Sequence, residues 1–163
     1  MSERVERIVK NYPQMVMERN CLQQQIAAFK GVTEQEVIEA MNFSVPQGER
    51  VQTSNITDKT AGIGISYRER TRRINRDWLD HLATRLMALD DELTFFESAI
   101  RSLPTPLCAF MHDLAIERLT WDALEAKYHI SRFTVSTYRK RAISELDTLF
   151  AAHDRAVAAY ILS

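Results

Sequence analysis

The sequence predicts an all-α protein in which long helices form a coiled coil and a helix-turn-helix follows near the C-terminal end. Glycine and proline number four each in 163 residues, so few positions interrupt a helix. Apolar residues recur at alternating steps of three and four over long stretches, which is the spacing of helices that pack against helices. Residues 120–141 have the pattern of two capped helices joined by a tight turn.

Composition and charge limit the class of protein. Apolar residues make up 45% of the chain, which is enough for one sizeable core or two small ones. The formal net charge of −1 excludes a general polycation, so binding to a polyanion must come from local charge. The segment MSERVERIVK lacks the apolar core of a signal peptide, and no stretch reaches the roughly 18 apolar residues of a membrane span. We therefore expect a soluble, cytoplasmic protein without a membrane partner.

The first predicted region, residues 1–66, begins with a long helix. Its apolar positions, from Val5 to Phe29, follow the helical period. Pro13 is expected to kink this helix or to divide it in two, because proline lacks the N–H of a helical hydrogen bond. Gly31 is a natural end for it.

A short helix and a long loop are expected to complete this region. Thr33 opens the helix, and Glu36, three residues on, completes a capping box. Residues 44–66 are rich in Ser, Thr, Asn and Gly, which is typical of a loop or an arm on the surface. The GIG at 62–64 lacks the third glycine and the strand–helix context of a nucleotide-binding loop.

The central region, residues 67–103, is predicted to be one helix with an apolar seam more than three heptads long. Such a seam needs a partner helix. An antiparallel hairpin with the first helix and a homodimeric coiled coil both satisfy it. We favour the dimer because the sites that helix-turn-helix proteins read are often two-fold. The seam residues are Leu79, Leu82, Leu86, Leu89, Leu93, Phe96, Ile100 and Leu103.

The last region, residues 104–163, carries the helix-turn-helix pattern. Thr120 caps a helix of about two turns, and Ser131 caps the final helix, which begins at Arg132. Between them, His129 stands where such turns often need a positive φ, which His tolerates better than most residues. The inside of the corner is expected to hold Leu124, Tyr128, Ile130, Val135 and Tyr138. Glu125 occupies a position where Ala or Gly usually allows close crossing, so either the helices cross more widely or Glu125 turns outward.

The outer face of the final helix has the chemistry that a DNA major groove accepts. Arg132 can reach guanine O6 and N7 or a phosphate, and Phe133 can contact a thymine methyl group. Helix N-termini at the two caps favour phosphates. The alternative is an ordinary solvated basic face. The predicted DNA-binding residues are Thr120, Ser131, Arg132, Phe133, Ser136, Thr137, Arg139, Lys140 and Arg141.

A second basic cluster precedes the apolar seam, as a basic region precedes a leucine zipper. It offers additional phosphate contacts, and a solvated helix end is an equally good interpretation. Its residues are Arg68, Arg70, Arg72, Arg73 and Arg76.

No catalytic or metal site is expected, and no cofactor. The adjacent acids Asp90, Asp91 and Glu92 point to different faces of a helix and make no catalytic pair. The histidines lack neighbours at ligand spacing. Cys21 and Cys108 lie far apart within apolar helical patterns, so we expect two reduced, buried thiols, with a disulfide as the poorer alternative.

Residues 95–146 resemble region 4 of sigma-70-type factors. The matching residues are Leu103, Pro104, Leu119, Thr120, Trp121, Leu124, Tyr128, Ile130, Ser131, Thr134, Val135, Ala142, Ile143 and Leu146. The resemblance implies that the final helix reads a promoter element of the −35 type through Arg132, Phe133, Ser136, Thr137 and Arg141. The segments NYPQM at 11–15 and GERVQTSNITDKTA at 48–61 precede the long helix, and with them the whole chain also resembles small phage and mobile-element regulators of late-gene transcription, of the RinA/ArpU type. Nothing in it resembles the region with which complete sigma factors melt DNA.

These observations lead to one main hypothesis. The protein is expected to be a sequence-specific, double-stranded DNA-binding transcription regulator, an activator of phage or mobile-element genes, with RNA polymerase as a possible second partner. One alternative is a small terminase subunit, which also combines a helix-turn-helix with coiled helices. The other is a helical protein–protein interaction module.

Overall fold

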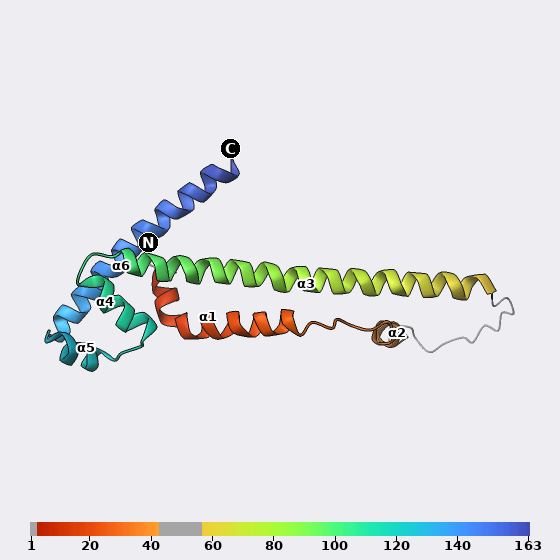
Figure 1. Ribbon diagram of the computed structural model, residues 1–163, viewed down its shortest axis with the longest axis horizontal. Helices are drawn as coiled ribbons and strands as arrows, with labels where there is room; N and C mark the ends of the chain where they lie inside the picture. The colour runs from red at the N-terminus through yellow and green to blue at the C-terminus, as the bar shows by residue number, and fades with distance from the viewer. Residues whose placement is uncertain (1–2, 43–56) are drawn as a thin grey trace. The chain divides into compact units, whose positions relative to one another are not determined.

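The computed structural model describes residues 3–42 and 57–163, and this part of the chain is helical with no strand. This confirms the all-α prediction. Figure 1 shows the helices in chain order. They are α1 (Glu3–Ala27), α2 (Glu34–Asn42), α3 (Thr57–Ser102), α4 (Leu107–Met111), the π-helix η1 (His112–Ile116), α5 (Trp121–Tyr128) and α6 (Arg132–Ile161).

Two compact units divide the chain. One unit comprises residues 1–21 and 87–163, and the other comprises residues 22–86. The boundaries fall inside α1 and α3, because each of these helices contributes to both units.

In the larger unit, α1 packs antiparallel to the end of α3 from Tyr12 onward. The Tyr12 hydroxyl donates a hydrogen bond to Glu97 Oε1 over 2.7 Å, and Arg19 Nη1 lies 3.5 Å from Asp90 Oδ1. From Tyr12 to Arg19, residue numbers rise along α1 as they fall along α3, which fixes the antiparallel direction of this stretch. Five seam residues are buried at 6% exposure or less, so the chain's own helices supply their partner; they are Leu89, Leu93, Phe96, Ile100 and Leu103.

Pro13 lies within an undivided α1, which bends in its N-terminal part (Figure 1). Proline has no N–H to donate to the carbonyl four residues back, so the Val9 carbonyl loses its helical partner. Arg118 replaces it: its Nη1 donates to the Val9 oxygen over 2.9 Å. The helix therefore continues through the proline because a side chain far along the sequence satisfies the freed carbonyl.

In the smaller unit, the segment that follows α1 runs along α3 in the opposite direction. Phe29 meets Trp78 edge to face, with ring centroids 5.8 Å apart. Gly31 has a φ of +70°, and a Cβ there would lie 2.5 Å from the Asn75 side chain, so only glycine fits. The Asn75 amide accepts from the Val32 N–H over 2.8 Å and donates to the Val32 carbonyl over 3.1 Å.

The predicted capping box is confirmed in this unit. The Thr33 N–H donates to Glu36 Oε2 over 2.7 Å, and the Glu36 N–H donates to Thr33 Oγ1 over 3.3 Å. The Thr33 N–H and the Thr33 hydroxyl both donate to the Glu36 carboxylate, which lowers the pKa of Glu36 below its usual value.

Two expectations from the sequence were wrong. Helix α3 begins at Thr57 rather than near residue 67, so residues 57–66 of the predicted loop, including the GIG, are helical. The low helix propensity of these Gly, Ser and Thr residues does not prevent a helix when it continues a longer one. The rest of the predicted loop lies outside the described residues. Cys21 is exposed and Cys108 is half-buried, because each lies off the packed face of its helix, and they form no disulfide with each other.

The packing of Phe96 gives a stability prediction. Phe96 is fully buried, whereas Phe133 on α6 is 81% exposed. We expect Phe96→Ala to lower the free energy of unfolding by about 3–5 kcal/mol, because it removes buried apolar surface and leaves a cavity. The same substitution at Phe133 is expected to change it by less than about 0.5 kcal/mol. Urea denaturation followed by circular dichroism measures both; equal losses would contradict the described packing.

Candidate nucleic-acid interface

Helices α5 and α6 form a corner that is capped at both N-termini. Thr120 Oγ1 accepts from the Ala123 N–H over 3.2 Å, and Ser131 Oγ accepts from the Thr134 N–H, also over 3.2 Å. Both predicted caps are confirmed. Each cap satisfies one backbone N–H that the first turn of a helix leaves without a partner.

The turn between the two helices is tight. His129 has φ 53° and ψ 45°, in the left-handed region that the sequence predicted for it. The N–H groups of His129 and Ile130 both point to the Glu125 carbonyl, and the Ile130 nitrogen is 3.2 Å from it. This arrangement ends α5 and turns the chain directly into the next N-cap. The Glu125 side chain is half-buried.

The inside of the corner is apolar and rests on α4. Leu124 and Val135 are fully buried, as the sequence predicted. Phe110 of α4, also fully buried, contacts the rings of Tyr128 and Tyr138, with centroids 6.0 Å and 5.6 Å away. Because these side chains fix one side of α6 against the body of the unit, the opposite side must face outward.

A polar network that the sequence pattern did not predict stabilises the same corner. Asp113 in η1 is only 7% exposed. The Tyr128 hydroxyl donates to its Oδ2 over 2.6 Å, and Lys127 Nζ lies 2.6 Å from the same oxygen. The one available signal was an acid inside the apolar run FMHDLAI; its partners lie fourteen and fifteen residues on and carry no local signature.

The network shifts two pKa values. Burial of Asp113 favours its neutral form, but the hydrogen bonds from Lys127 and Tyr128 outweigh this, so the pKa of Asp113 falls below its usual value. The pKa of Tyr128 is raised well above its ordinary value by burial and by the bond to Asp113. The carboxylate therefore stays charged and the phenol stays protonated around neutral pH.

Most of the predicted DNA-binding residues lie on the outward side of this corner. Phe133 is 81% exposed, an unusual position for a large aromatic ring. Ser136 and Arg139 are half-buried. The exposed members of the set are Thr120, Ser131, Arg132, Thr137, Lys140 and Arg141.

Arg132 is oriented by α5. Its Nη1 donates to Asp122 Oδ1 over 3.1 Å, and its guanidinium carbon lies 5.5 Å from the centroid of the Trp121 ring. With Thr120 these residues line an open cavity of about 440 Å³ at the first turn of α5. The sequence pattern did not indicate these roles of Trp121 and Asp122, because Asp122 lies ten positions before the arginine that it contacts.

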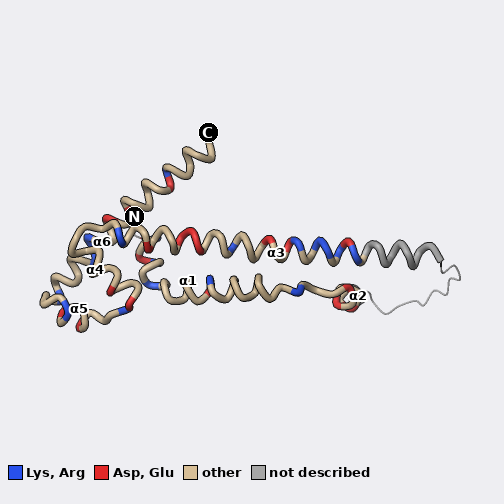
Figure 2. Tube along the Cα trace, viewed as in Figure 1, with Lys and Arg blue, Asp and Glu red and all other residues tan. Residues whose placement is uncertain are grey.

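The second basic cluster lies on α3 in the smaller unit, where Figure 2 shows the band of basic residues. All five arginines are exposed. Arg68 Nε lies 3.4 Å from Glu34 Oε1 of α2. The structure describes the cluster as part of a continuous helix, which fits both a solvated face and a phosphate-binding one.

Neither a metal site nor a membrane span emerges within residues 3–42 and 57–163. No three acidic, histidine or cysteine side chains there gather as metal ligands would. None of the helices described combines the length and apolar character that crossing a bilayer requires. Comparisons with family models, with curated proteins and with solved structures give no match to this chain.

The turn at His129 provides a test of the corner. Glycine adopts positive φ without the steric cost that an L residue meets, so we expect His129→Gly to raise the free energy of unfolding by about 0.5–1 kcal/mol. Ala126→Gly, three residues earlier inside α5, is the matched control and is expected to lower it by a similar amount. Thermal denaturation of both variants checks the opposite signs; destabilisation by both would contradict a left-handed residue at 129.

The Asp113 network predicts acid sensitivity. Because the folded state lowers the pKa of Asp113, its contribution to stability is present above the unfolded pKa of about 4 and is lost as pH falls through the folded value. Asp113→Asn should therefore be less stable than the parent at pH 7 by about 1–3 kcal/mol and lose less of its remaining stability between roughly pH 5 and 2.

Asp91→Asn is the control, because Asp91 is exposed on α3. Its free energy of unfolding, measured by urea denaturation at a series of pH values, is expected to depend on pH as that of the parent does. A parental pH profile for Asp113→Asn would exclude Asp113 as the source of the acid sensitivity.

Proposed function

We propose that this protein is a sequence-specific, double-stranded DNA-binding transcription regulator that activates phage or mobile-element genes in the manner of sigma region 4. The observation that carries the proposal is the two-sided character of α6. Val135 and Ala142 are fully buried, while Phe133, Lys140 and Arg141 on its other side are exposed. A helix fixed in this way presents a rigid basic face of the kind that enters a major groove.

Each exposed side chain has a role in this proposal. Arg132, in the first turn of α6, contacts a guanine edge or a phosphate, and Phe133 contacts a thymine methyl group. Thr137 donates its hydroxyl to the Phe133 carbonyl over 3.0 Å, which leaves its oxygen as an acceptor for a base amino group. Lys140 and Arg141 contact phosphates, so binding depends steeply on salt.

The contact between Arg132 and Asp122 is compatible with this role. Both side chains are well exposed, at 66% and 84%. Ion pairs at such exposure contribute about 0–1 kcal/mol, so DNA can take over the guanidinium at little cost. Until then, Asp122 and the Trp121 ring hold Arg132 close to the N-terminus of α5, where the cap at Thr120 also favours a phosphate.

We further propose a homodimer and a contact with RNA polymerase. The polymerase contact rests on the resemblance to sigma region 4. For the dimer, the seam residues of the larger unit are already buried within the chain, so a second copy needs another surface. The projecting end of α6 offers one, because Val157, Tyr160 and Ile161 are 42%, 83% and 73% exposed.

Arg132→Ala tests the proposed reading face. It should weaken binding to the duplex sequence that the protein prefers by about 1–3 kcal/mol, because a bidentate contact to a base is lost. Arg155→Ala is the matched control: Arg155 is exposed on the same helix, beyond the corner, and its loss should leave binding within about twofold. Fluorescence anisotropy, with a duplex selected from a random pool, provides both affinities.

Three outcomes would contradict the proposal. Unchanged affinity of Arg132→Ala for every duplex would exclude this face. Absence of duplex binding at low salt would favour the protein-interaction module instead. A ring of eight or more subunits would favour a small terminase subunit over a dimeric regulator, and light scattering measures the assembly.

A further inference from the structure

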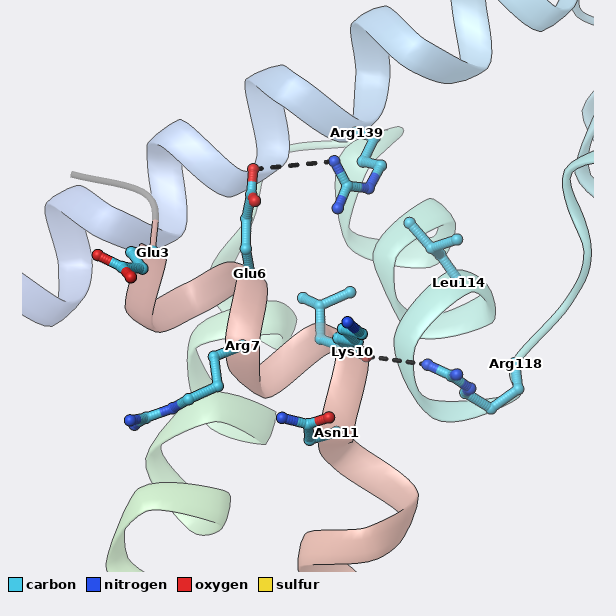
Figure 3. Close-up of a pocket in the computed structure, with 9 residues that line it drawn as sticks. Glu3, Glu6, Arg7, Lys10, Asn11, Leu114, Arg118 and Arg139 are labelled. Atoms are coloured by element: carbon cyan, nitrogen blue, oxygen red, sulfur yellow. Dashed lines mark hydrogen bonds and ion pairs between the residues drawn. The ribbon is translucent and has the colours of Figure 1, made fainter.

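A cleft of about 490 Å³ lies beside the corner, where the first turns of α1, the segment from η1 to α5, and α6 come together (Figure 3). All three walls belong to the larger unit. The floor is apolar, formed by Val9 and Leu114, and the rim is charged. The residues that line it are Glu3, Glu6, Arg7, Val9, Lys10, Asn11, Leu114, Arg118 and Arg139.

The rim of the cleft is cationic overall, with four basic side chains against two carboxylates. Arg7 is engaged elsewhere, because its Nη2 lies 3.4 Å from Glu92, and Figure 3 shows it pointing away from Arg139. Lys10 is exposed, and no acidic group contacts it within the part of the chain that the structure describes. Lys10, Arg118 and Arg139 are therefore the cations that remain for a ligand.

Arg118 is fixed at the cleft by two features. Its backbone has a φ of 59°, and its Nη1 is bonded to the Val9 carbonyl that Pro13 leaves without a partner. A guanidinium carries five N–H donors, and among the described residues Arg118 uses one of its nitrogens, so donors remain on a group whose position is already set.

The contact between Arg139 and Glu6 is loose. Glu6 Oε1 lies 4.0 Å from Arg139 Nη1, beyond hydrogen-bonding distance, with the side chains 50% and 30% exposed. Figure 3 shows the two facing each other at the edge of the cleft. Such a pair is weak, so an external anion can displace the carboxylate from the arginine at small cost.

The cleft and Arg132 lie along the same side of α6. Arg139 follows Arg132 by seven residues, which is two helical turns, so both arginines lie on the same side of α6, roughly 10 Å apart along its axis. Phosphates follow one another about every 3.4 Å of axis on each strand of a duplex, so a duplex that engages Arg132 also has phosphates about 10 Å further along its backbone.

We infer that the cleft holds a phosphate of the DNA backbone, contacted by Lys10, Arg118 and Arg139, with Glu6 as the internal anion that it displaces. This rests on the proposed function, because the phosphate belongs to the duplex that α6 reads. An acidic polypeptide would also pair with these cations, but its binding gives no reason for the cleft to lie on the same side of α6 as Arg132. The cleft assigns a DNA-binding role to the first turns of α1, which the sequence patterns left outside the interface.

Two variants test the inference in salt titrations of duplex binding. Lys10→Gln should lower the slope of log affinity against log salt by about one phosphate contact and weaken binding several-fold on any duplex sequence. Glu6→Gln should tighten binding about two- to fivefold, because the competing carboxylate is gone. Lys30→Gln and Glu145→Gln, at exposed positions outside the cleft, make the same charge changes and should reproduce neither effect.

The results separate this inference from the proposed function. Parental slope and affinity for both cleft variants, while Arg132→Ala still weakens binding, would overturn the cleft alone. Absence of duplex binding by the parent would overturn both. Calorimetric titration with inorganic phosphate is expected to show no saturable binding at low millimolar concentration; submillimolar binding together with an unchanged duplex slope would make the cleft a site for small anions instead. Binding of an acidic peptide that Lys10→Gln weakens, while duplex binding by the same variant stays at the parental level, would likewise overturn a DNA phosphate as the ligand.

Discussion

The packing of α6 against α4 is the contact on which the larger unit and its candidate interface depend. Phe110 lies at its centre, fully buried and in contact with the rings of Tyr128 and Tyr138. Burial of an aromatic side chain of this size is among the largest single contributions that a small core receives. Because the contact fixes the rotation of α6 about its axis, it also decides which of its side chains reach solvent.

Polar ties at the edge of this core then set the finer geometry. Asp113 contacts both Lys127 and Tyr128 at the end of α5, just before His129 with its left-handed backbone. Arg118 joins the connection before α5 to α1 through the Val9 carbonyl. Each tie satisfies a group whose burial without a partner would be costly, so each restricts where the neighbouring helix can lie. The helices that carry the proposed interface and the cleft beside it are therefore held in place by these polar contacts.

The sequence alone anticipated much of the local structure. Caps at Thr120 and Ser131, the capping box at Thr33 and the positive φ at His129 depend on neighbours within four residues, and all four were correct. The start of α3 was wrong because polar and glycine-rich composition weakens a helix without forbidding it. The burial of the two cysteines was wrong because a periodic pattern marks a helix but leaves uncertain how much of its circumference is covered.

The sequence by itself thus determined the helices apart from the start of α3, the caps at Thr120 and Ser131, and the exposure of Phe133 and Lys140 on α6, since these follow from short-range hydrogen bonding and from helical period. Only the tertiary structure decided which helix covers the seam of the larger unit and which carboxylate contacts Arg132. It also decided which guanidinium donates to the Val9 carbonyl that Pro13 leaves without a helical partner. Those contacts join residues from ten to more than a hundred positions apart. Which of these residues meet depends on how the helices pack, and the periodicity of the sequence does not indicate that packing.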